Sequence, residues 1–364
     1  MKRIGMCAAL GLCAVLLAAC GLAGGSSSAA GSAGGNTDPL TGEISGWPGR
    51  RVAAVVIDNA PDTASQWGLS EASVVIEALT SAGQPSSLCL AYPSVEAMPC
   101  VGPVAAGQDL FWRLLAAQQV LPVQRGCGRY TDNYLDFYGL RAVDAREVGR
   151  KAFSCAREWS NAPPWVTSGT AVSGVLGELN LSGQLSRVGA NARVEQDADG
   201  REQITVPALL PFQEGGRRAA ASAEDAVQVQ LCFNASSSTG FVYDPDSRTY
   251  RMLRGDGTPR VDANSGTQAA FDNLLVLYST SYPRDDGVTL DYDLSMGGGV
   301  WLNGGQLWNV TWRQGTETTF ALYDAGGKAL SIQPGRSYLA LVSSVTGQEL
   351  TVLNTAGENL LLSP

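Results

Sequence analysis

The chain has 364 residues and a formal net charge of −9, and this acidic balance argues against a nucleic-acid-binding protein, which would need clustered lysine and arginine. The sequence contains no histidine, which excludes Ser-His-Asp and Cys-His catalysis and HExxH zinc sites. It contains neither a Ser-x-x-Lys motif nor a P-loop. The sequence therefore leaves open carboxylate chemistry or none, and it indicates no cofactor and no metal site.

The N-terminus has the pattern of an export signal. Lys2 and Arg3 precede an apolar stretch over residues 4–19 that is too short to span a bilayer comfortably. The stretch ends in Leu17-Ala18-Ala19-Cys20, which resembles a bacterial lipobox and predicts cleavage before Cys20 and lipidation of its thiol. Residues 20–37 then form a small-residue tether. We expect a lipid-anchored protein on the extracytoplasmic face of a cell membrane; the alternatives are an ordinary signal peptide or a transmembrane anchor.

The region 38–180 alternates apolar strands with helical patterns, which predicts an α/β domain with a parallel or mixed sheet. The expected strands are 52–57, 88–92 and 120–123. The expected helices are 69–79, 110–119, 134–138 and 170–179. The first of these helices is predicted from the helical spacing of Leu69, Ala72, Val75, Ile76 and Leu79.

The second half of the chain has a different texture. Residues 181–226 are polar and rich in Gly, Ala and Arg, which predicts a connector with an exposed linker at 215–218. From residue 227 onward, turn signals such as Asn303-Gly304-Gly305 recur about every ten residues. We therefore predict a mostly β domain over 227–364.

Beyond Cys20 the mature chain has five cysteines, and an extracytoplasmic compartment permits disulfides. Cys89 and Cys100 are the favoured pair, because they would close a short loop between two expected strands. Cys127 could be considered a nucleophile, but no imidazole base exists in the chain. A buried thiol or a bond to Cys155 is the preferred interpretation of Cys127.

Many short motifs, in one order along the chain, resemble the YerB-like lipoproteins, a family with N-terminal and C-terminal domains of unknown function. In the first half these motifs are Pro39-Leu40-Thr41-Gly42, Val56-Ile57-Asp58-Asn59-Ala60-Pro61, Gln66-Trp67-Gly68-Leu69-Ser70-Glu71-Ala72 and Gly102-Pro103-Val104. In the second half they include Val242-Tyr243-Asp244, Gly257-Thr258-Pro259-Arg260-Val261-Asp262, Asn273-Leu274-Leu275-Val276 and Phe320-Ala321-Leu322-Tyr323-Asp324. The resemblance covers nearly the whole mature chain.

Polar side chains typical of this family are missing here. Where the family has histidine or arginine, this chain carries Ala60, Ala105, Gln108 and Pro164, and Arg260 stands where the family has histidine. If those groups line a site in relatives, this member has lost or rebuilt it. An anion that relatives hold through them should bind this chain weakly, because alanine and glutamine cannot replace a charged arginine fork.

The candidate ligand-binding residues are Asp58, Asn59, Gln66, Glu77 and Asp262. Asp58 and Asn59 follow the first expected strand, where open α/β sheets bind ligands, and the preferred alternative is a capped turn. Glu77 would need a partner if buried, so it is either a functional acid or one half of an ion pair with an arginine such as Arg113. Hairpin turns also explain aspartates such as Asp262, whose spacing does not form a calcium loop.

Three tryptophans, Trp301, Trp308 and Trp312, could form a sugar-stacking face, with core packing as the alternative. Our first hypothesis is a non-enzymatic surface lipoprotein that binds or scaffolds an envelope partner, such as cell-wall glycan or an exported protein. The second is a hydrolase of an envelope substrate that acts through Asp58 and Glu77.

Overall fold

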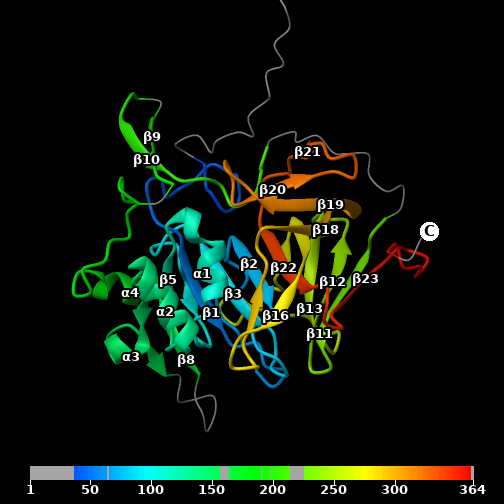
Figure 1. Cartoon of the computed structure of the whole chain (residues 1–364), viewed down its shortest axis with the longest axis horizontal. Coiled ribbons are helices and arrows are strands. Elements are labelled where there is room, and N and C mark those ends of the chain that lie inside the picture. Colours follow the sequence, from blue (N-terminus) through cyan, green and yellow to red (C-terminus); the bar gives the residue numbers. More distant parts are fainter. Residues whose placement is uncertain are drawn as a thin grey trace, which may run out of the picture.

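A computed structural model describes residues 37–63, 65–155, 164–189, 191–197, 199–213 and 225–361. The signal peptide, Cys20, nearly all of the tether and the linker at 215–218 lie outside these residues. Figure 1 shows the helices gathered on one side of a long central sheet, with a smaller antiparallel sheet on the other side. The fold class is the predicted one: a mixed sheet in the first half, followed by a mainly antiparallel β region.

The central sheet contains strands from both halves of the chain. From the first half come β1 (Ala53–Ile57), β2 (Val74–Ala78), β3 (Ser87–Tyr92), β5 (Leu121–Gln124) and β6 (Val143–Asp144). From the second half come β15 (Asn273–Ser279), β18 (Met296–Asn303), β19 (Gln306–Gln314), β20 (Phe320–Tyr323), β21 (Ala329–Leu330) and β22 (Ser337–Ser343). Their order is β21-β20-β19-β18-β15-β22-β2-β3-β1-β5-β6.

Strand β22 joins the two halves. It pairs in parallel with β2 on one side and with β15 on the other. Because β22 is the second-to-last strand in chain order and β2 is the second, residues far apart in sequence meet along this seam. The polar connector thus separates the halves along the chain, while the sheet continues across them.

A second sheet packs beside the seam in the order β14-β13-β12-β11-β23. Its strands are β11 (Gln228–Asn234), β12 (Ser237–Asp244), β13 (Thr249–Arg254), β14 (Ala270–Phe271) and β23 (Glu349–Leu353). The smaller sheets consist of β4 (Cys100–Val101), β7 (Ser154–Cys155) and β8 (Trp165–Ser168); β9 (Arg193–Gln196) with β10 (Glu202–Thr205); and β16 (Ser281–Pro283) with β17 (Leu290–Tyr292).

The helices are short and belong to the first half. They are α1 (Asp109–Leu114), α2 (Arg129–Tyr138), α3 (Ala145–Val148) and α4 (Gly169–Leu176), with 3₁₀ turns at Ala116–Gln118 and Gly149–Lys151. The predicted helices at 110–119, 134–138 and 170–179 are therefore present, the first of them as a helix followed by a 3₁₀ turn. The predicted strands at 52–57, 88–92 and 120–123 correspond to β1, β3 and β5.

The predicted helix at 69–79 is wrong, because this segment contains strand β2. All five residues of β2 are buried, since the strand lies between β22 and β3 inside the sheet. A strand covered on both faces is a continuous apolar run, and periodicity alone cannot distinguish such a run from a buried helix.

The three tryptophans belong to the core. Trp301, Trp308 and Trp312 are 1%, 3% and 1% exposed, and the first two rings stack with centroids 4.4 Å apart. The Trp301 indole N–H donates to Asn273 Oδ1, as a buried indole requires. The core-packing alternative is therefore correct, and the sugar-stacking face is excluded for these residues.

The predicted disulfide between Cys89 and Cys100 is absent, and both thiols are free. Cys89 is buried in β3 of the central sheet, whereas Cys100 lies in β4 of a different sheet. Burial raises the pKa of both thiols, which opposes formation of the reactive thiolate. Within the described ranges, no helix has the length and apolarity needed to cross a membrane.

Candidate functional site

The site begins where β1 ends. Strand β1 is fully buried and ends at Ile57, and the backbone N–H of the next residue, Asp58, donates to Pro103 O over 2.8 Å. The Asp58 side chain is exposed and accepts a hydrogen bond from the Ala60 N–H at 3.0 Å, so it caps its own turn. Asn59 points the other way and is only 9% exposed. The turn thus exposes one of the two predicted residues and buries the other.

Glu77 is completely buried in β2, and donors from both halves of the chain surround its carboxylate. Oε1 accepts from Asn59 Nδ2 at 3.1 Å and from Ser86 Oγ at 2.5 Å. Oε2 accepts from Tyr338 OH at 2.6 Å, and Thr239 Oγ1 lies 3.0 and 2.9 Å from the two oxygens. A buried carboxylate needs such donors to replace its lost hydration.

The predicted pairing of Glu77 with Arg113 is wrong. Arg113 forms its ion pairs with Asp291 and Asp109 instead. Burial lowers the pKa of the Arg260 guanidinium and the charge of Glu77 opposes that shift, so Arg260 is the arginine that the Glu77 charge acts on.

Arg260 completes this buried cluster from the other side. It is 5% exposed, and its NH1 donates to Asn59 Oδ1 at 2.6 Å and to Gln66 Oε1 at 2.7 Å. Gln66 is itself buried and donates through Nε2 to Asp58 O at 2.7 Å. Asn59 thus bridges Glu77 and Arg260. We call this set the seam network; its members are Asn59, Gln66, Glu77, Ser86, Thr239, Arg260 and Tyr338.

Charge is unevenly compensated around Arg260. Burial lowers the pKa of the Arg260 guanidinium, Glu77 opposes that shift, and the nearby positive charge of Arg254 adds to it. Arg260 Nε is buried and has no hydrogen-bond acceptor among the described residues. A second guanidinium next to an incompletely satisfied one is the electrostatic setting that favours an anion.

A pocket of about 490 Å³ opens beside these groups. Its walls come from the turn after β1, the β11–β12 hairpin and the end of β13; the residues are Asn59, Ala60, Pro61, Ala235, Ser236, Ser237, Ser238, Arg254, Gly255, Asp256 and Arg260. We call it the Arg260 pocket. Three serines and two arginines are among its lining residues, with Asp256 as the acidic residue in its wall.

Asp262, the remaining predicted residue, does not line the Arg260 pocket and instead accepts hydrogen bonds from backbone N–H groups. It is fully buried, and its oxygens accept from the Ser70 N–H and the Asn264 N–H, each at 2.7 Å. Glu71 lies close enough for its pKa to be raised by burial and by the charge of Asp262. These bonds fasten the segment that contains Gln66 to the turn after Arg260.

The segments in which the family has other polar residues also converge at this end of β1. Ala105 N donates to Val56 O at 2.8 Å, and Val104 N donates to Trp165 O at 2.7 Å. Of the substituted positions Ala60, Ala105, Gln108 and Pro164, however, only Ala60 lines the Arg260 pocket. The lost groups and the pocket of this chain therefore occupy mostly different places.

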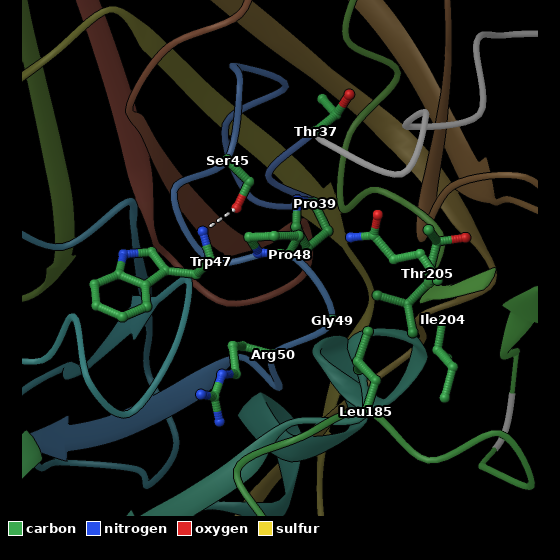
Figure 2. Close-up of a pocket in the computed structure, with 12 residues that line it drawn as sticks. Thr37, Pro39, Ser45, Trp47, Pro48, Gly49, Arg50, Leu185, Ile204 and Thr205 are labelled. Atoms are coloured by element: carbon green, nitrogen blue, oxygen red, sulfur yellow. Dashed lines mark hydrogen bonds between the residues drawn. The ribbon is translucent and has the colours of Figure 1, made fainter. Parts of the chain in front are cut away.

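One other pocket is a weaker candidate. Figure 2 shows a narrow pocket between the N-terminal segment and β10, in which Thr205 and Arg50 lie on different walls. Its volume of about 20 Å³ is room for roughly one water molecule, although Thr205 Oγ1 is buried without a partner among the described residues. No group of three or more Cys, Asp or Glu side chains in the described part of the chain could hold a metal ion.

These observations define a class of protein: a two-part chain whose halves share one mixed sheet and meet at a buried polar network beside a pocket. Residues 40–180 match the family model of the N-terminal domain described as "Protein of unknown function (DUF3048)". Residues 227–339 match the model of the corresponding C-terminal domain. The chain therefore belongs to the DUF3048 family of YerB-like proteins, as the motifs indicated.

Similar proteins come from Bacillus subtilis. The protein named "Putative lipoprotein YerB" of strain 168 is 24% identical over 306 residues, which are 83% of this chain and 84% of the relative. The crystal structure of the Bacillus subtilis YerB protein matches with a TM-score of 0.70 at 21% identity and covers 86% of this chain and 99% of that chain. The structural likeness supports the fold.

Sequence reasoning found three members of the seam network, Asn59, Gln66 and Glu77, and missed the residues that complete it. Ser86, Thr239 and Tyr338 carry no local signal, because each lies in or beside a strand with ordinary apolar neighbours. Arg260 did carry one: it is a charged residue at a position where the family has another polar group. In the structure Asp58 caps its turn, and Asp262 connects two backbone segments. Their predicted role as ligand contacts stays a prediction.

Proposed function

We propose that the protein is a lipoprotein, anchored through Cys20 to the extracytoplasmic face of a bacterial cell membrane, that binds a small envelope ligand through its negatively charged group. The Arg260 pocket is the binding site in this proposal. The N-terminal pattern and a relative named as a lipoprotein support the anchor. The preference for an anionic group is inferred from the two arginines, Arg254 and Arg260, that line the pocket.

The observation that carries the proposal is the buried Arg260 guanidinium, beside which Arg254 adds a second positive charge. The buried Arg260 guanidinium uses NH1 for two neutral amide oxygens, and it forms no ion pair within 4 Å among the described residues. A phosphate or carboxylate group in the pocket would supply acceptors and reduce the repulsion between the guanidiniums. The serine hydroxyls at 236–238 would add neutral hydrogen bonds.

The alternative, a hydrolase that uses Asp58 and Glu77, receives no support from the geometry. The Asp58 side chain faces solvent and caps its turn, while both Glu77 oxygens are occupied by donors in the protein interior. A carboxylate pair for acid and base catalysis must reach the same substrate bond. Turnover of peptidoglycan fragments that is lost in Asp58→Ala would revive this alternative.

Calorimetric titration with inorganic phosphate and with small dicarboxylates tests the pocket, using the full mature chain with Cys20→Ser to keep it soluble. Replacing Arg260 by Met should weaken binding about tenfold or more, because a charge-assisted hydrogen bond contributes about 1.5–3 kcal/mol. Arg260→Lys keeps the positive charge but lacks the planar guanidinium donors, so its affinity should lie between those of the parent and Arg260→Met. Arg313→Met, which changes an exposed arginine outside the pocket, is the matched control.

Equal anion affinity in the parent, Arg260→Met and Arg313→Met proteins would contradict the proposed pocket. So would a complete failure of both anion classes to bind at millimolar concentration. Far-UV circular dichroism of each variant shows whether the fold is kept, and Arg254→Met provides a second test at a less buried arginine.

The anchor is tested separately in cells. Metabolic labelling with an alkyne fatty acid should mark the parent and not Cys20→Ser, because the thiol of Cys20 is the acylation site that the pattern predicts. Undiminished label on Cys20→Ser would end the lipoprotein assignment while leaving the ligand pocket unaffected.

A further inference from the structure

A second cavity lies on the helical side of the molecule, away from the Arg260 pocket. It has a volume of about 710 Å³ and lies between α1, α2 and the second half of the chain. Side chains that define it are Arg113, Tyr134, Tyr138, Gln184, Leu294 and Gln314. We call it the tyrosine groove. It shares no lining residue with the Arg260 pocket.

Helix α2 supplies aromatic rings to this groove. Tyr134 and Tyr138 are four residues apart and therefore lie on one face of the helix, with ring centroids 4.7 Å apart. Tyr138 is 65% exposed, and the adjacent Phe137 is 80% exposed and packs edge-on against it. Gly139 ends the helix in a left-handed conformation, which leaves this aromatic group at the helix end, on the helical side of the molecule in Figure 1.

The arginines of the groove are already occupied. Arg113 pairs with Asp291 and Asp109, so its charge is compensated within the protein. Arg51, which also lines the cavity, donates to the carbonyl oxygens of Gln119, Val120 and Ser182. In contrast to the Arg260 pocket, the groove therefore offers no unbalanced positive charge to an anion.

The remaining polar groups are neutral amides. Gln184 and Gln314 have exposed side chains that make no side-chain hydrogen bond to another described residue. Leu294, Leu140 and Ala116 supply apolar surface between them. Amides that can both donate and accept, placed next to aromatic faces, match a ligand that has many hydroxyl groups and apolar C–H faces.

We infer that the tyrosine groove binds carbohydrate, in the form of a neutral oligosaccharide segment that stacks on Tyr138 and Tyr134 and hydrogen-bonds to Gln184 and Gln314. An anionic ligand is disfavoured by the compensated arginines, and an apolar peptide helix by the amide-lined wall. The inference stands on different residues from the proposed anion pocket, so either can fail alone.

The test is calorimetric titration of the Cys20→Ser chain with a β-1,4-linked tetramer of N-acetylglucosamine as the probe. Tyr138→Ala should weaken binding about tenfold, which corresponds to about 1.4 kcal/mol. Tyr138→Phe keeps the ring and should stay within about twofold of the parent. Tyr323→Ala removes a half-buried tyrosine of β20 that does not line the groove, and it should leave the affinity unchanged.

Two outcomes would overturn the inference. One is the absence of binding at millimolar tetramer, and the other is equal affinity in the parent and Tyr138→Ala. Inorganic phosphate added at saturation should not compete with the tetramer. Competition by phosphate, with Arg260→Met abolishing tetramer binding, would place the sugar in the Arg260 pocket and contradict the groove.

Discussion

The seam network and the tyrosine groove differ in how their polar groups are satisfied. In the network, Glu77 and Arg260 are buried and their hydrogen bonds go mainly to other side chains of the protein. In the groove, Gln184, Gln314 and Tyr138 are exposed and the charged residues are already paired. Buried polar groups must be satisfied for the fold to persist, whereas exposed ones can be kept for a ligand.

This contrast predicts that changes in the network affect stability most. Replacing Glu77 by Ala leaves the hydroxyls of Ser86, Thr239 and Tyr338 without their acceptor and Arg260 without its nearest negative charge. Loss of one member of a buried charged cluster costs about 3–5 kcal/mol. Urea unfolding followed by circular dichroism should show a decrease of that size in the free energy of unfolding.

The matched control is Glu349→Ala, which removes an exposed glutamate of β23 and should change the free energy of unfolding by less than about 0.5 kcal/mol. Glu77→Gln should lie between the two, because it keeps the shape and loses the charge. If Glu77→Ala unfolds as the parent does, the network does not stabilise the joint between the halves, and the contrast fails.

Asp38 sharpens the comparison, since it is a buried carboxylate with fewer donors than Glu77. It accepts from the Leu40 N–H at 2.9 Å, and burial raises its pKa to about 6. A folded-state pKa above the unfolded value means that the unfolded chain loses this proton first as the pH rises. The folded state is therefore destabilised progressively from about pH 4 to pH 6, and above that by about 3 kcal/mol.

Asp38→Asn should remove this pH dependence. The stability difference between the variant and the parent should grow in favour of the variant from pH 4 to pH 6 and stay constant above pH 7. Chemical denaturation at four pH values measures it, and taking the difference cancels the contribution of the other carboxylates. A difference that does not change with pH would mean that Asp38 is ionised as easily in the folded as in the unfolded chain.

The same contrast explains what the sequence could predict. Strands β1, β3 and β5 were evident because short β-branched or apolar runs are bounded by turn residues, and the turns after residue 227 were evident from Asp, Asn and Gly. Strand β2 was not, because burial on both faces removes the alternation that marks a strand. The Cys89–Cys100 bond was predicted from spacing alone, which cannot show that two strands enter different sheets.

Site prediction had a similar limit. Asn59 and Gln66 were identified because they lie in motifs near the first strand, but their partner Arg260 is more than 190 residues away in sequence. The Glu77 partners Thr239 and Tyr338 are likewise more than 160 residues away from it. Such pairs depend on the order of strands in the sheet, which local patterns do not encode. The helix at 134–138 was also predicted from the sequence. The exposure of its aromatic side chains could not be, because it depends on which other elements pack against the helix.

The smallest stability effect is expected in the tyrosine groove, and it provides the clearest test of the contrast. Tyr138 is 65% exposed and contacts Tyr134 and Phe137, so replacing it by Ala removes little buried area. Its free energy of unfolding should stay within about 0.5 kcal/mol of the parent, while its affinity for the N-acetylglucosamine tetramer falls. Urea unfolding and calorimetry on the same preparations compare the two quantities directly.

Both results are needed, because each excludes a different explanation. If Tyr138→Ala lost stability as well as affinity, the ring would be part of the packing of α2, and the weaker binding would follow from a disturbed helix. If it lost neither, the exposed rings would have no role in carbohydrate binding. Loss of affinity at unchanged stability is the outcome expected of a side chain that is exposed because its partner is a ligand.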